Sequence, residues 1–110
     1  MQLIDWQKLQ FQFGNSQKLT FWIDQICDQS EHELALLQQA RQDYQLKIQV
    51  VGIFTGIASL LMFSPLEHTC QWLQHSDERN YTQGLEHLEQ CYCELLEQLR
   101  NYRQSNLTHI

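Results

Sequence analysis

The side chains best suited to chemistry are four cysteines and five histidines, and their spacing builds no metal or redox site. No two cysteines have the C-x-x-C spacing typical of such sites; they are Cys27, Cys70, Cys91 and Cys93. On a helix, Cys91 and Cys93 point about 200° apart. His87 and Cys91 can share a helix face, but two ligands are too few for a closed zinc site. We therefore predict reduced, mostly packing cysteines and no bound metal.

Acidic and hydroxyl side chains do not form a catalytic arrangement either. Several carboxylates surround His87 near the C-terminus, where a solvated helix face is the simpler interpretation; they belong to Glu86, Glu89, Glu94 and Glu97. The sequence contains no glycine-rich phosphate loop and no nucleophile elbow. No serine or threonine stands in a defensible arrangement with His and Asp. We expect no enzymatic activity and no cofactor.

Length and composition limit the kind of molecule that positions these residues. The chain has 110 residues, which fits one domain. Four glycines and one proline are too few for the turns of a β-sandwich or barrel. A formal net charge of −6 argues against nucleic-acid binding. The longest apolar stretch, residues 50–63, is shorter than the roughly twenty residues that span a bilayer, and the N-terminus lacks a signal-peptide pattern. We expect a helical, cytoplasmic protein without membrane insertion.

Apolar residues recur at helical spacing along most of the chain. The pattern predicts helices over residues 3–11, 16–40, 44–62, 65–75 and 81–103. Because four long amphipathic helices with short loops pack as a bundle, we predict an all-α fold, an antiparallel four-helix bundle with a short extra N-terminal helix. The bundle forms one domain over residues 1–104, and a polar C-terminal tail follows over 105–110.

Helix starts and inner faces are also predicted. Asn15 or Ser16 can cap the second helix, and Ser64 with Pro65 and Glu67 has the pattern of a capping box. The inner positions of the second, fourth and last helices are Leu19, Ile23, Ile26, Leu34 and Leu37; Leu66, Thr69, Cys70 and Leu73; and Tyr81, Leu85, Leu88, Tyr92, Leu95, Leu99 and Tyr102.

The third helix has two unlike sides. Large apolar residues fall on one side and predict a core face; they are Val50, Ile53, Phe54, Ile57 and Leu61. Small, uncharged residues with apolar ones at both ends fall on the other; they are Ile48, Gly52, Thr55, Gly56, Ser59 and Met62. Each glycine costs about 1 kcal/mol relative to alanine inside a helix. That cost indicates close approach by another helix or by a partner protein, unless the glycines serve internal packing.

These elements, in this order, resemble a histidine-containing phosphotransfer (HPt) domain. Ile4-Asp5-Trp6 with Phe13-Gly14-Asn15 resembles the family's entry into its long second helix, and Asp43-Tyr44 resembles the pair that opens its active helix. The segment 52–58, Gly-Ile-Phe-Thr-Gly-Ile-Ala, stands where the family has H-x-x-K-G-x-A. Leu66, Cys70 and Leu73 match its L-x-x-x-C-x-x-L run. The resemblance covers nearly the whole chain.

The departures from this family bear directly on function. Gly52 occupies the phospho-acceptor position, Thr55 the lysine position, and Met62 the position of a second family glycine. Phosphotransfer needs an imidazole nucleophile and a cation beside the phosphoryl group, and neither residue supplies one. The resemblance therefore implies a pseudo-HPt domain. It would bind the receiver domain of a response regulator, or a histidine kinase, through Ile48, Gly52, Thr55, Gly56, Ser59 and Met62.

Two other functions remain open from the sequence. The same face could pack against a second copy or a neighbouring domain, which would make the chain a structural or self-association module. An active phosphotransfer protein could instead use another histidine. His68 is the candidate, although it lies opposite Leu66, Cys70 and Leu73 like an ordinary solvent-facing residue. The remaining histidines, His32, His75, His87 and His109, offer less.

Overall fold

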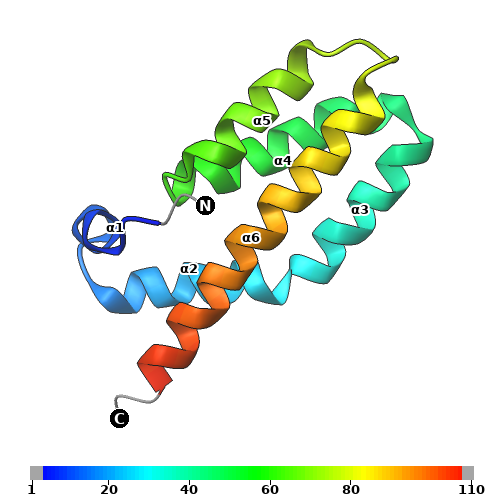
Figure 1. Ribbon diagram of the computed structural model, residues 1–110. Helices are drawn as coiled ribbons and strands as arrows, with labels where there is room; N and C mark the ends of the chain where they lie inside the picture. Colours follow the sequence, from blue (N-terminus) through cyan, green and yellow to red (C-terminus); the bar gives the residue numbers. More distant parts are fainter. Residues whose placement is uncertain (1–3, 108–110) are drawn as a thin grey trace.

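The computed structural model describes residues 4–107, with side chains described through residue 105. Within that range every element is helical, which confirms the all-α class. The elements are α1 (Trp6–Phe13), α2 (Ser16–Asp28), α3 (Ser30–Gln42), a 3-10 turn η1 (Tyr44–Leu46), α4 (Lys47–Leu60), α5 (Ser64–His75) and α6 (Tyr81–Leu107). They form an elongated molecule of 49 × 23 × 22 Å (Figure 1).

The helices α3, α4, α5 and α6 pack in chain order. α4 contacts α5, α5 contacts α6, and α6 also contacts α3, while α3 contacts α4. α2 packs on the C-terminal half of α6, and α1 packs on α2 (Figure 1). The N-terminal segment is held by a hydrogen bond from Ile4 N to Gln98 Oε1 (2.9 Å) and by stacking of Trp6 on Tyr102 with ring centroids 4.2 Å apart.

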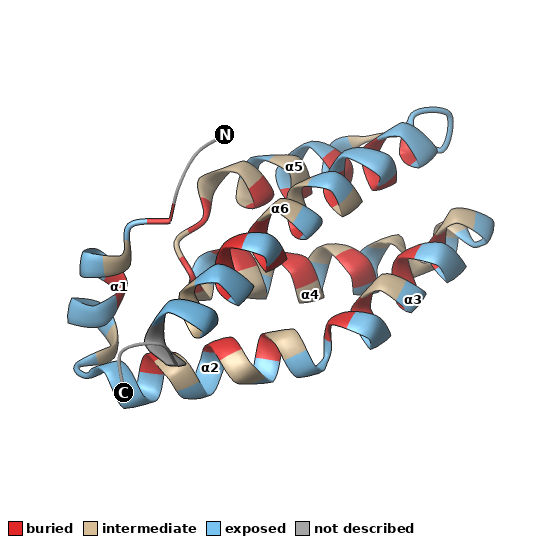
Figure 2. Ribbon diagram, turned by 60° about the horizontal axis from the view of Figure 1, so that its bottom comes forward, coloured by how far each residue is buried: buried red, intermediate tan, exposed pale blue. Residues whose placement is uncertain are grey.

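The core lies where the predicted inner faces meet (Figure 2). The predicted seam of α6 is buried from Tyr81 to Leu99, with only Tyr102 half-buried. On α5 the predicted inner residues Leu66, Cys70 and Leu73 are buried as well. Phe54 of α4 meets the buried Tyr92 ring edge-on, with centroids 4.9 Å apart. Burying such large apolar side chains is the main stabilising term of the fold.

The prediction of a single long helix over residues 16–40 is wrong, because the helix is interrupted at Gln29. Gln29 has φ −93° and ψ 0°, and Ser30 Oγ donates a hydrogen bond to the Cys27 carbonyl at 2.7 Å. The break shifts the inner positions of the second half. The predicted Leu34 is half-buried, and the buried positions of α3 are Ser30, Glu33, Leu36, Leu37 and Ala40.

Helix boundaries show which predicted caps form. Asn15 caps α2 as predicted, accepting from Lys18 N at 2.8 Å, and Gly14 before it has a left-handed φ of 85°. Ser64 does not cap α5: the helix already includes Ser64, and Phe63 stands at the cap position without a side-chain hydrogen bond. α6 continues to Leu107, beyond the predicted end at Arg103 and into the segment expected to be a tail. The remaining tail residues, 108–110, and the predicted helix start at Leu3 lie outside the described residues.

Candidate docking face and adjoining cleft

Four residues of α4 form a surface strip that we call the outer face of α4: Ile48, Gly52, Gly56 and Ser59. All four are exposed, and Ile48 is 84% exposed although it is a large apolar residue. No charged residue occurs between Lys47 and Glu67. Scattered apolar residues on a surface need no explanation, but this strip is continuous along the helix and carries no charge.

Two of the six residues predicted for this face lie elsewhere. Thr55 is half-buried and turned toward α5, where its side chain acts on the buried Cys70 thiol. Burial raises the pKa of Cys70, and the Thr55 contact opposes that shift. Met62 lies beyond the end of α4, half-buried, with a left-handed φ of 51°. A bulky side chain seldom adopts this conformation, so Met62 stands where glycine would be relaxed.

Neither glycine of the outer face is required by packing inside the chain. A Cβ built on Gly52 or on Gly56 meets no atom within 4 Å. At Gly84 of α6, in contrast, a Cβ would lie 2.6 Å from Trp72 Cζ3 and 2.7 Å from Leu73 Cδ1. Internal packing therefore accounts for Gly84, whose role the sequence does not reveal, and leaves Gly52 and Gly56 without an intramolecular reason.

On the α5 side, the outer face borders a groove of about 650 Å³ lined by Tyr44, Gln45, Lys47, Ile48, Val51, Gly52 and Gln74. Lys47 is the cation nearest to Gly52 in the sequence on this helix. Its ammonium is already engaged: Nζ donates to the Ser76 carbonyl at 2.6 Å and lies 5.3 Å from the centroid of the Tyr44 ring. The groove therefore pairs apolar surface with a positive charge that is held in place.

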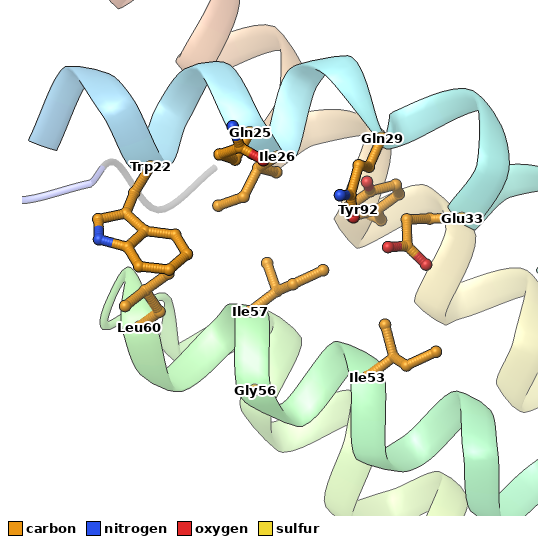
Figure 3. Close-up of a pocket in the computed structure, with 10 residues that line it drawn as sticks. All are labelled: Trp22, Gln25, Ile26, Gln29, Glu33, Ile53, Gly56, Ile57, Leu60 and Tyr92. Carbon is orange, nitrogen blue, oxygen red and sulfur yellow. The ribbon is translucent and has the colours of Figure 1, made fainter.

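On the opposite side, a cleft of about 270 Å³ separates α4 from α2 (Figure 3). It exists because the chain turns at Gln29: α3 packs against α4, whereas α2 makes little contact with it. We call it the α2–α4 cleft; its lining residues are Trp22, Gln25, Ile26, Gln29, Glu33, Ile53, Gly56, Ile57, Leu60 and Tyr92. The predicted core residues Ile53 and Ile57 are only half-buried because they face this cleft.

Two buried polar groups in the α2–α4 cleft have no hydrogen-bond partner within residues 4–107. They are Oε2 of Glu33, a residue only 8% exposed, and the hydroxyl of the fully buried Tyr92. Burial raises the pKa of Glu33, and His32 opposes this by lowering it. Burial also raises the pKa of Tyr92, reinforced by the nearby Glu33 charge. Sequence reasoning missed Glu33, because a glutamate among polar neighbours is indistinguishable from a surface residue.

The histidines and cysteines lie away from the outer face of α4. His32, His68, His75 and His87 are exposed, and His68 shares a surface hollow with Trp72 and His87 between α5 and α6. His109 lies outside the described residues. All four cysteines are free thiols, with Cys70 buried and Cys93 exposed. In the part of the chain described, no three His, Cys, Asp or Glu residues gather as metal ligands.

None of the helices described over residues 4–107 has the length and apolar character to traverse a lipid bilayer. Comparisons with models of protein families, with curated proteins and with solved structures find no match to this chain.

Proposed function

We propose that the chain is a pseudo-HPt module, which binds a receiver domain or a histidine kinase through the outer face of α4 and modulates a phosphorelay without accepting phosphate. One observation carries the proposal: α4 presents an exposed, uncharged strip with glycine where the resemblance expects the phospho-accepting imidazole. The setting is a cytoplasmic two-component system.

The packing of the helices supports such a module. α3, α4, α5 and α6 contact one another in chain order, with α6 returning to α3, and α1 lies outside this group. An antiparallel four-helix bundle with a short extra N-terminal helix has this pattern of neighbours. In the proposal, α2 and α3 together take the place of the family's long second helix, and α4 takes that of its active helix.

The chemistry of α4 supports docking rather than phosphotransfer. Gly52 offers no nucleophile, and Thr55 is uncharged and turned toward Cys70. Phosphotransfer of this kind requires an imidazole nucleophile within reach of the phosphoryl group, and the outer face of α4 carries no histidine. The absence of an imidazole also lets a partner approach the helix backbone more closely. The lack of positive charge between Ile48 and Glu78 should slow electrostatic steering toward an acidic receiver pocket.

A receiver-binding screen tests the proposal. Receiver domains encoded in the same genome are titrated against the monomer by calorimetry, alongside Gly52→Arg and the matched variant Gln90→Arg, which places the same charge on an exposed position of α6. We expect Gly52→Arg to lower the affinity for the receiver at least about tenfold, which is about 1.4 kcal/mol, because the long side chain would hold the partner away from the helix backbone that glycine leaves accessible. Gln90→Arg should bind like the natural chain. Equal affinities for both variants would contradict docking on α4.

A labelling experiment tests the missing chemistry separately. Incubation with a receiver carrying labelled phosphate should leave the chain unlabelled. Acid-labile label on His68 would instead establish an active phosphotransfer protein that uses another histidine. The double substitution Gly52→His with Thr55→Lys tests the register of the resemblance, since it restores nucleophile and cation and should restore labelling if the face still fits a receiver.

Self-association is a second candidate function, favoured by the open space that a Cβ at Gly52 or Gly56 would meet and by the 84% exposure of Ile48. Small residues four apart let two helices approach closely, which would bury the strip in a homodimer. Sedimentation over a range of concentrations would then show a dimer that Gly52→Arg dissociates and Gln90→Arg does not. A mass independent of concentration would leave receiver or kinase docking as the use of this face.

A further inference from the structure

The α2–α4 cleft combines an apolar wall with buried polar groups that the protein leaves unpaired. Figure 3 shows the Glu33 carboxyl group directed into the gap between the two helical layers, near Tyr92 and Gln29, while Trp22 covers the opposite end above Leu60. Ile53 and Ile57 project into the gap from α4. Such a division between one polar end and an apolar body is the usual anatomy of a small-molecule site.

A buried carboxylate without a partner is costly, and a native protein that keeps one requires an explanation. Glu33 Oε2 and the Tyr92 hydroxyl both lack hydrogen-bond partners within the described range, although each residue is more than nine-tenths buried. No ion pair neutralises Glu33 within the described residues, where the two salt bridges join Arg41 to Glu89 and Arg103 to Asp24. The one titratable neighbour that acts to lower the pKa of Glu33 is the exposed His32.

From these observations we propose that the α2–α4 cleft binds a small amphipathic amine, whose ammonium group bonds Glu33 and Tyr92 and whose apolar part lies between Trp22 and Ile57. An ammonium group carries three donors and one positive charge, which matches a carboxylate oxygen and a phenol oxygen that both lack donors. Charge-assisted hydrogen bonds of this kind are about twice as strong as neutral ones. The net charge of −6 favours the approach of cations.

The size of the cleft limits the ligand. About 270 Å³ lies just below the usual range of small-molecule sites. It accommodates one short aliphatic or monocyclic aromatic amine and is too small for a nucleotide cofactor. The site is separate from the docking proposal, since Gly52 does not line the cleft, and Gly56 is the residue that the two surfaces share.

Three matched probes test the charge requirement. Phenethylamine, 2-phenylethanol and phenylacetate share a ring and a two-atom or shorter tether but carry a cation, a neutral hydroxyl and an anion. Each is titrated into the full chain while amide and indole resonances are followed by NMR. We expect phenethylamine to shift the Trp22, Glu33 and Ile57 resonances. The dissociation constant obtained from these shifts should be at least about tenfold lower for the amine than for the alcohol, which is the ratio that one charge-assisted hydrogen bond provides. Phenylacetate should not bind there.

Substitutions then locate the charge. Glu33→Gln keeps the shape of the side chain and removes its charge, so phenethylamine should lose its advantage over the alcohol. Glu31→Gln makes the same change at an exposed position of α3 and should leave both affinities unchanged. Equal binding of amine and alcohol to the natural chain, or amine binding that survives Glu33→Gln, would overturn the proposal.

A further control keeps the result interpretable if Glu33→Gln perturbs folding. Trp22→Ala removes a 42% exposed side chain from the apolar end, so the fold should persist while phenethylamine binding weakens. Unchanged binding in Trp22→Ala would place the amine elsewhere and contradict the site. Because receiver docking is measured with Gly52→Arg, failure of the amine site leaves the docking result unaffected, and the reverse also holds.

Discussion

Two helical surfaces of this molecule use glycine for opposite reasons. Gly84 lies where α6 meets α5, and any side chain there would overlap Trp72 and Leu73. Gly52 and Gly56 lie on the outer face of α4, where a side chain would meet open space. The first glycine is dictated by the fold. The other two glycines lower helix stability, and no contact within the chain compensates for this loss. A contact with another molecule would explain them.

Packing within the fold explains Gly84, whereas it explains neither Gly52 nor Gly56. Both surfaces are helical, so the intrinsic cost of glycine is the same, about 1 kcal/mol relative to alanine. Only at α5–α6 does a close contact offset that cost. Substitution by alanine should therefore change stability in opposite directions at the two surfaces, and this sign is the sharpest test of the interpretation.

The largest effect is expected at the α5–α6 contact. Gly84→Ala places a methyl group 2.6 Å from Trp72 and 2.7 Å from Leu73, so neighbours must shift. Overpacking of this kind typically costs about 1–3 kcal/mol. Urea denaturation should show this loss in the free energy of unfolding. A stability equal to or above that of the natural chain would show that the exposed Trp72 ring moves aside and that the contact is not close in solution.

A smaller effect of opposite sign is expected on α4. The double substitution Gly52→Ala with Gly56→Ala should stabilise the chain by about 1–2 kcal/mol, since each alanine gains helix propensity and meets no neighbour. The same variant should bind its partner more weakly if the glycines admit a close approach. Stabilisation without any loss of receiver binding or self-association would remove the functional interpretation of both glycines.

The glycine comparison extends to Met62, which has a left-handed φ of 51°. Met62→Gly and Met62→Ala remove the same half-buried side chain, but only glycine adopts this backbone conformation without strain. We expect the glycine variant to be more stable than the alanine variant by about 1 kcal/mol. This order is the reverse of the one expected at Gly52. Thermal unfolding of the two variants measures it, and equal midpoints would mean that the turn after α4 relaxes.

Much of the fold could be predicted because its signals are local and periodic. The α6 seam from Tyr81 to Leu99 repeats at helical spacing, and Asn15 follows a glycine turn, so both emerge from the sequence and are confirmed. The break at Gln29 has no proline or glycine to mark it. The one visible signal was Ser30, which bonds back to Cys27 rather than capping forward.

The candidate site was predictable only along α4 itself. Helical periodicity placed Ile48, Gly52, Gly56 and Ser59 together, but it assigned Thr55 to the same surface, because periodicity does not reveal where the neighbouring helix α5 lies. Met62 was predicted to lie on the same face because the helix was expected to continue to residue 62, but α4 ends at Leu60. The α2–α4 cleft depends on the bend at Gln29. A prediction with one helix over residues 16–40 therefore could not place Glu33 beside Tyr92.

The smallest expected effect concerns that cleft and tests whether Glu33 is as isolated as it looks. Burial raises the pKa of Glu33 above its ordinary value of 4.5. Above pH 4.5 the unfolded chain therefore releases this proton before the folded chain does, so the unfolded state binds fewer protons and stability falls as pH rises toward the folded pKa. The free energy of unfolding of the natural chain should decline more steeply over this window than that of Glu33→Gln, whereas Glu31→Gln should follow the natural chain. Identical slopes for Glu33→Gln and Glu31→Gln would mean that solvent or a neighbouring group already satisfies the Glu33 carboxylate. The side of α4 that faces α2 would then need no external ligand, like the closely packed contact between α5 and α6.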